Sequence, residues 1–132
     1  MKRLLTATMV LTLLAACGGL SNKAKRIAGS YCNTSVSDEV PVFELNPDGT
    51  CVMRAIRPDV LTISVKGTWN VVDDTLVIQH NLATVQAEGD TSLVGTVAPE
   101  FKALVVGHSD YSLTLLRDGI EYEYIRHNAA AM

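Results

Sequence analysis

The sequence is poor in aromatic residues and has no hydrophobic run long enough to cross a membrane. Only 5% of its 132 residues are Phe, Trp or Tyr. Because ligand pockets are usually rich in aromatic side chains, this scarcity favours a domain filled by its own core. The apolar run at residues 4–16 is also shorter than the roughly 20 residues that a membrane-spanning helix needs.

Positive charge is equally scarce. The chain carries 11 Lys and Arg against 14 Asp and Glu, a net charge of −3. Loss of an N-terminal segment containing Lys2 and Arg3 would make the remainder more acidic. Such a domain offers no basic surface for nucleic acid or for anionic lipid, so neither is expected as a partner.

No pattern of catalytic or metal-binding residues is present. His80, His108 and His127 lack the spacing of a structural metal site, and we expect them in turns or on the surface. The residues of "HSD" (108–110) are adjacent, whereas the members of a hydrolase triad converge from separate parts of a fold. We therefore expect no enzyme, no metal and no cofactor.

The N-terminus has the layout of a secretory signal peptide, with Lys2 and Arg3 before an uncharged apolar core. This segment, residues 1–16, ends in "LAAC", which resembles a bacterial lipobox. That resemblance implies cleavage before Cys17 and acylation of Cys17 by long chains such as palmitate. Because each buried acyl CH₂ contributes about 0.8 kcal/mol, more than one chain gives stable membrane attachment.

The residue after the lipobox cysteine is Gly18 rather than Asp, which resembles sorting to the outer membrane. We expect an outer-membrane lipoprotein whose domain lies in the periplasm, with surface display as the alternative. Residues 17–26 are predicted to form a lipidated flexible tether because they are small, polar or basic. The folded domain is predicted over 27–127, followed by a tail at 128–132.

From residue 27 onward the chain has the pattern of β-strands. The clearest is "LTISVKGTWNVV" (61–72), where apolar and polar residues alternate with period 2. Turn sequences such as "NPDG" (46–49) and "RDG" (117–119) separate similar runs at short intervals. Eight or nine strands with even spacing predict an antiparallel barrel, because closure removes exposed sheet edges.

Three segments resemble small bacterial lipocalin-like domains: "FELNPDGTC", "GTWNVVDDTLVIQH" and "YSLTLLRDGIEYEYIR". The resemblance covers roughly residues 29–126. It implies an up-and-down barrel of about eight strands, with structural roles for Trp69 and the closing Arg126.

Cys32 and Cys51 are the two cysteines left beside Cys17. An oxidising envelope compartment favours a disulfide between them. In a simple meander, however, the two strands would lie two strand spacings apart, roughly 9.5 Å. The disulfide is the prediction, and two free thiols in the core are the alternative.

Glu44 lies in the run "VPVFEL" and has two interpretations. In the first, it faces outward and pairs with a basic residue on the next strand, such as Arg54. Alternatively, it points into the barrel and binds the polar head of a ligand.

Tyr122, Tyr124 and Arg126 share one face of the last strand. They either plug one end of the barrel or line the mouth of a pocket. Together with Trp69 and Glu44 they are the candidate ligand-binding residues.

Two classes of function follow. In the first, a membrane-anchored, lipocalin-like barrel binds a small apolar ligand or a lipid. In the second, a ligand-free structural or interaction module contacts or inhibits another envelope protein. The volume of the inward side chains decides between them.

Overall fold

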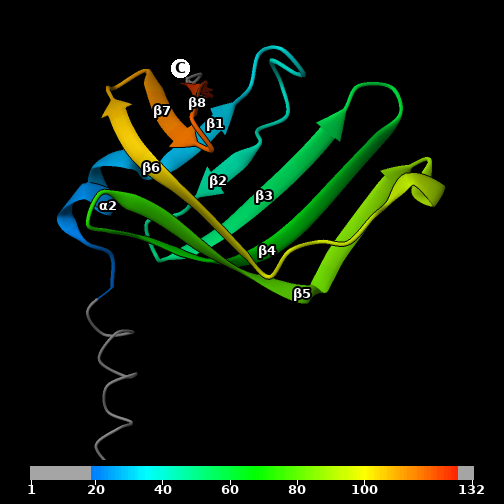
Figure 1. Ribbon diagram of the computed structural model, residues 1–132, viewed down its shortest axis with the longest axis horizontal. Coiled ribbons are helices and arrows are strands. Elements are labelled where there is room, and N and C mark those ends of the chain that lie inside the picture. The colour runs from blue at the N-terminus through cyan, green and yellow to red at the C-terminus, as the bar shows by residue number, and fades with distance from the viewer. Residues whose placement is uncertain (1–18, 128–132) are drawn as a thin grey trace, which may run out of the picture.

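The computed structural model describes residues 19–127, and they form a closed barrel of eight antiparallel strands (Figure 1). Each strand pairs with the next in the sequence, and the first pairs with the last. The predicted all-β, up-and-down barrel is confirmed. Its elements are α2 (Asn22–Ile27), β1 (Gly29–Cys32), β2 (Phe43–Leu45), β3 (Thr50–Arg57), β4 (Leu61–Val72), β5 (Thr75–Gly89), the 3₁₀ turn η1 (Thr91–Leu93), β6 (Glu100–His108), β7 (Ser112–Arg117) and β8 (Ile120–Arg126).

Two hairpins have the tight turns that their Asp and Gly residues predict. Val72 pairs with Thr75 across the β4–β5 turn, and Arg117 pairs with Ile120 across the β7–β8 turn. The two central residues of each turn, at 73–74 and 118–119, have positive φ. This is the type I′ geometry, whose twist matches that of the flanking strands.

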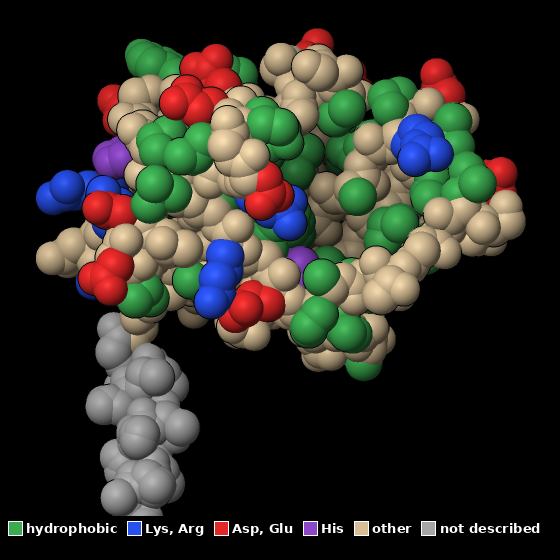
Figure 2. Space-filling view, viewed as in Figure 1, with side chains coloured by type: hydrophobic (Ala, Val, Ile, Leu, Met, Phe, Trp, Pro, Cys, Tyr) green, Lys and Arg blue, Asp and Glu red, His purple; other side chains and the backbone are tan. Residues whose placement is uncertain are grey.

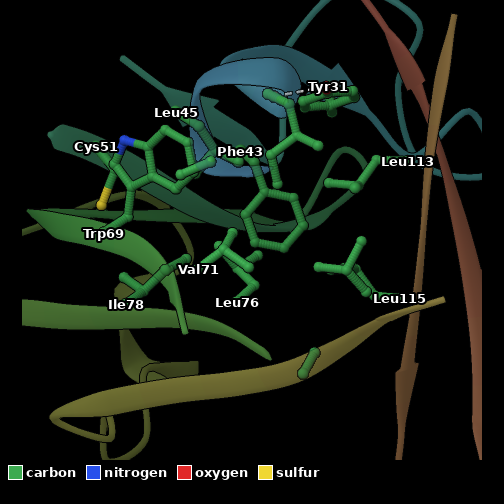
Figure 3. Close-up of a cluster of buried hydrophobic side chains, with 14 of the residues drawn as sticks. Tyr31, Phe43, Leu45, Cys51, Trp69, Val71, Leu76, Ile78, Leu113 and Leu115 are labelled. Carbon is green, nitrogen blue, oxygen red and sulfur yellow. Dashed lines mark hydrogen bonds between the residues drawn. The ribbon is translucent and has the colours of Figure 1, made fainter. Parts of the chain in front are cut away.

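The barrel interior is filled by side chains from the inward faces of its strands (Figure 3). Trp69 and Val71 on β4 are buried, whereas the alternate residues Thr68 and Val72 are exposed. The indole Nε1 of Trp69 donates a hydrogen bond to the carbonyl oxygen of Asn46 at 2.8 Å. The other large, fully enclosed side chains are Tyr31, Phe43, Leu45, Cys51, Leu76, Ile78, Leu113 and Leu115, with Ile27 from α2.

The helix α2 corrects the expected flexible tether. Ala24 and Ile27 on α2 are fully buried against the barrel, and Leu20 just before it is also buried. These three residues follow the spacing i, i+4, i+7, which places them on one face of a helix. The folded domain therefore begins near Leu20 rather than at Ile27.

Two polar side chains hold α2 in place at its N-terminal end. The Ser21 hydroxyl caps the helix by accepting from the backbone N–H of Ala24 at 3.2 Å. The Asn70 side chain accepts from the N–H of Ser21 at 2.9 Å and donates to the carbonyl oxygen of Gly19 at 3.3 Å. The segment that precedes the barrel is thus fixed to β4.

The predicted disulfide between Cys32 and Cys51 does not form, since both are free, buried thiols. Tyr31 points into the core, so the next residue, Cys32, points to the outer face, whereas Cys51 belongs to the core. Strand β2 also lies between β1 and β3, which separates the two Cα atoms by roughly 9.5 Å or more. A disulfide needs less than about 7 Å. Burial raises the pKa of the Cys51 thiol to about 11.

Candidate functional site

Strands β3, β4 and β5 extend beyond the closed part of the barrel (Figure 1). Strand β2 pairs with β3 only at Cys51–Met53, and β6 pairs with β5 only at Thr75–Gln79. Past these points the ladders join the three strands only to one another, apart from single backbone hydrogen bonds from Arg54 to Val42 and from His80 to Pro99. We call this three-stranded extension, formed by residues 54–57, 61–64 and 86–89, the wing. We call the rest of the barrel the body.

A bulge in β5 joins the wing to the body. The pairs Ser64–Gln86 and Lys66–Asn81 leave residues 82–85 opposite the single residue Val65. The Thr84 hydroxyl accepts from the backbone N–H of Lys66 at 2.9 Å and donates to the carbonyl oxygen of Asn81 at 2.7 Å. Because bulges bend the strand that contains them, this one changes the direction of β5 where the wing begins.

A cavity of about 220 Å³ lies between the inner face of β3 and β4 and the segment that leads into β6. We call it the wing cleft. The space-filling view is hollowed between body and wing, with hydrophobic side chains around the hollow (Figure 2). The lining residues are Met53, Arg54, Ala55, Ile63, Val65, His80, Thr96 and Val97. Apart from Arg54, His80 and Thr96, the lining is apolar.

The imidazole of His80 is held by the segment that covers the cleft. Its Nδ1 lies 3.0 Å from the carbonyl oxygen of Ala98, and its backbone N–H donates to the carbonyl oxygen of Pro99 at 2.8 Å. Among the side chains of residues 19–127, the Nε2 of His80 is the one buried polar atom without a hydrogen-bond partner. Buried polar atoms are nearly always paired, so an unpaired buried nitrogen is unusual. It is the atom of the cleft wall that could form a hydrogen bond with a ligand.

Gly67, which pairs with His80 across the β4–β5 ladder, has no room for a side chain. A Cβ at this position would lie 2.1 Å from the carbonyl oxygen of Gln79 and 3.1 Å from the Cα of His80. The absence of a side chain lets β4 and β5 approach closely beside the cleft. This is the physical role of the glycine in "GTW".

The part of the body next to the cleft contains an aromatic cluster. Phe43 packs edge-on against Tyr124 at 4.9 Å between ring centroids, and against Phe101 at 5.6 Å. Tyr122 stacks on Tyr124 at 6.5 Å, and the Arg117 guanidinium lies 4.8 Å from the Phe101 centroid. Phe43 pairs with Met53 on β3, so the cluster adjoins the cleft wall. The structure thus brings Tyr122 and Tyr124 together, whereas Trp69 lies deeper in the core.

Two of the other sequence candidates are not among the residues that line the cleft. Glu44 is on the outer face of β2 and forms a salt bridge with Arg54, so it does not point into the barrel. Arg126 lies at the α2 end, where its Nη1 donates to the carbonyl oxygen of Ala28 at 2.9 Å. Its guanidinium is 5.1 Å from the Tyr31 ring centroid. Arg126 therefore contacts the end of the barrel that α2 crosses, apart from the two tyrosines.

Cys17 lies outside the described residues. His108 and His127 are exposed, as expected, whereas His80 lies within strand β5 and is only partly exposed, with its Nε2 buried. It continues the inward series of Leu76 and Ile78 on β5. Because side chains alternate along a strand, the positions of Leu76 and Ile78 could have predicted that His80 faces the barrel interior.

A second and larger hollow, of about 460 Å³, lies at the bulge on the outside of the barrel. Six of its nine lining residues carry polar side chains, and among residues 19–127 none of its buried side-chain polar atoms lacks a partner. Its lining residues are Asn46, Thr50, Cys51, Val52, Lys66, Gly67, Thr68, Asn81 and Thr84. The wing cleft is therefore the better candidate for an apolar ligand.

The fold defines the class of protein, a closed eight-stranded antiparallel barrel with a helix across one end. No family model matches the chain, and no curated protein matches it. The structure is similar to the crystal structure of an uncharacterized protein from Bacteroides eggerthii. The TM-score is 0.46 and the sequence identity 15%, over 67% of this chain and 84% of that chain. None of the helices within residues 19–127 is long and apolar enough to cross a membrane.

Proposed function

We propose that this protein is a binding protein of the cell envelope that holds a small apolar molecule in the wing cleft. The observation that carries the proposal is the apolar cavity of about 220 Å³ between β3, β4 and the segment before β6. An apolar cavity of about 150 Å³ is enough to bind benzene. The wing cleft therefore suits a molecule the size of one ring with a short chain.

The interior of the body, as residues 19–127 form it, is filled by side chains. Its central side chains, including Phe43, Leu76 and Leu113, have no exposed surface. A ligand in the middle of the barrel would have to displace this core, which costs more than a small ligand gains. The scarcity of aromatic residues accordingly fits a filled body, and we assign binding to the wing cleft.

The lipobox sequence and the position of α2 support attachment to a membrane through Cys17. Only Gly18 stands between Cys17 and Gly19, so the chain between them spans at most about 7 Å. Gly19 is fixed to Asn70 at the α2 end of the barrel. An acyl anchor on Cys17 would hold this end near the bilayer, and the wing, at the other end, would face away from it (Figure 1).

The binding proposal is tested by titrating the purified full-length lipoprotein with 4-propyltoluene by isothermal calorimetry. We expect saturable binding, and we expect Ile63→Trp to weaken it at least tenfold because the larger side chain fills the cleft. Val72→Trp makes a similar change at an exposed position on the β4–β5 hairpin and serves as the control. Absence of binding, or equal binding by Ile63→Trp, would overturn the proposal.

The anchoring proposal needs a separate experiment. Cells fed with labelled palmitate should label the wild-type chain but not Cys17→Ser, and the wild type should fractionate with the outer membrane. Cys32→Ser is the matched control, because it removes another thiol without touching the lipobox. Labelling of Cys17→Ser would contradict the assignment.

A ligand-free interaction module is the second candidate. It is favoured by two exposed apolar residues on the outer face of β6, Leu104 and Val106, with Leu104 paired to Leu116 on β7. Native mass spectrometry of the gently purified protein separates the two functions. A bound small molecule supports the first, and a co-purifying protein in place of it supports the second.

A further inference from the structure

We infer that the wing cleft selects neutral ligands that carry a hydroxyl group on an apolar body, with the Nε2 of His80 as the hydrogen-bond acceptor. The inference rests on the proposed function, since it concerns the chemistry of the same cleft. It adds a specificity that the apolar lining by itself does not provide. The residue that determines it is His80.

The contact with Ala98 fixes the protonation pattern of the imidazole. A carbonyl oxygen can only accept a hydrogen bond, so the Nδ1 that lies 3.0 Å from it must carry the proton. In the neutral ring the proton is then absent from Nε2, which is left with a lone pair. Nε2 therefore needs a donor, and none of residues 19–127 provides one.

A ligand donor gains free energy here because the acceptor is already removed from water. Leaving a buried acceptor unpaired has a cost that a ligand hydroxyl would remove on binding. A hydrocarbon of the same shape fills the apolar space but leaves Nε2 unpaired. The cleft should therefore distinguish two molecules that differ only in this one group.

Charge in the cleft wall does not favour an ionic ligand. Arg54 is the one lining residue with a full charge, and its guanidinium forms a salt bridge with Glu44 and donates to the carbonyl oxygen of Pro41 at 3.2 Å. Its charge is thus already paired on the outer side of the sheet. A carboxylate in the cleft would meet the lone pair of Nε2 without a free cation, so the ligand class is a neutral alcohol or phenol.

The test compares 4-propylphenol with 4-propyltoluene, in which a methyl group replaces the hydroxyl. For the wild-type lipoprotein at neutral pH we expect the phenol to bind about tenfold more tightly, the effect of one hydrogen bond. Equal affinity of the two compounds would overturn the inference and leave the binding function intact. Absence of binding by both would overturn the binding function as well.

Two variants then test His80 itself. In His80→Asn the side-chain amide can replace Nδ1 as the donor to Ala98, but nothing replaces Nε2. We expect the roughly tenfold preference for the phenol over 4-propyltoluene to disappear, because one hydrogen bond is lost, whatever change in affinity the two compounds share. His80→Gln, whose amide reaches the position of Nε2, should restore part of the preference. His108→Asn, at an exposed histidine on β6, is the control that should change nothing. A preference that survives in His80→Asn would overturn the role of His80.

A spectroscopic measurement on the wild type is independent of how the variants fold. In ¹⁵N spectra of the histidine side chains, His80 should show the tautomer with the proton on Nδ1. Its Nε2 resonance should shift when 4-propylphenol is added and stay unchanged with 4-propyltoluene. A proton on Nε2, or equal shifts with both compounds, would contradict the assignment.

Discussion

The body and the wing belong to one sheet but have different physical properties. In the body every strand has a partner on both sides, and side chains such as Phe43, Leu76 and Leu113 are fully enclosed. In the wing β3 and β5 each have one unpaired edge, and the inward-facing Ile63 is only half-buried. We therefore expect stability to be concentrated in the body, whereas the wing has fewer pairing partners and a less enclosed inner face.

This difference separates a rigid scaffold from a region that has free space. A filled interior gives a rigid scaffold but leaves no space for a ligand. An incomplete extension of the same strands has space, and the scaffold fixes its position. The bulge at residues 82–85 marks the boundary between the two regions.

The largest effect that would test this comparison is expected for Trp69→Ala. Removing a buried Trp costs about 3–5 kcal/mol, a large part of the stability of a small domain. Ile63→Ala in the wing should cost about 1 kcal/mol, because its side chain is already partly exposed. Urea unfolding followed by circular dichroism gives both values. Similar losses for the two variants would mean that the wing contributes to stability as the body does.

Gly67→Ala is expected to have the next largest effect. The new Cβ would meet the carbonyl oxygen of Gln79 at 2.1 Å, so β4 and β5 must move apart. Overpacking of this kind typically costs about 1–3 kcal/mol. Gly95→Ala is the matched control, since a Cβ there meets nothing within 4 Å. Thermal unfolding of both variants should show a lower midpoint for Gly67→Ala and little change for Gly95→Ala.

The sequence predicts the body well because its signals are local. Period-2 alternation places Trp69 and Val71 inside, and the Asp-containing turns define the hairpins on either side of them. The helix α2 cannot be recognised in the same way, because its six residues, Asn22–Ile27, are too few for a clear apolar period. The disulfide prediction was wrong because the two cysteines point to opposite faces of the barrel wall.

The candidate site is harder to predict because it depends on where pairing stops. Nothing in the sequence of β6 shows that it pairs with β5 only up to Gln79. Because the pairing stops there, one edge of the wing has no partner strand. The segment at 94–99, which covers the cleft, has no periodic pattern. His80 alone could have been found, because it continues the alternation of Leu76 and Ile78.

A pH titration probes the burial of Cys51 in the body. Its pKa is raised by burial to about 11 from an ordinary value near 9, so the folded state favours the neutral thiol. The resulting stability is fully present below pH 9 and is lost as the pH rises through 11. Unfolding free energy should therefore fall by about 2 kcal/mol more in the wild type than in Cys51→Val over this range. Burial also raises the pKa values of Tyr31 and Tyr124, so the variant retains part of the decline. An identical decline in both proteins would mean that Cys51 is accessible to solvent.

The smallest expected effect is at the boundary, in Thr84→Val. The substitution removes the hydroxyl that accepts from the N–H of Lys66 and donates to the carbonyl oxygen of Asn81, at a cost of about 1 kcal/mol. Because these bonds hold the bulge and not the core, the loss should appear as local opening. Amide hydrogens of residues 86–89 should exchange about fivefold faster, while the global unfolding midpoint changes little. Thr62→Val, also in the wing, is the control, because no hydrogen bond of its side chain is found among the described residues. If the global free energy of unfolding falls as much as the free energy of local opening does, body and wing unfold together as one unit. The cleft would then owe its shape to the whole barrel rather than to the bulge.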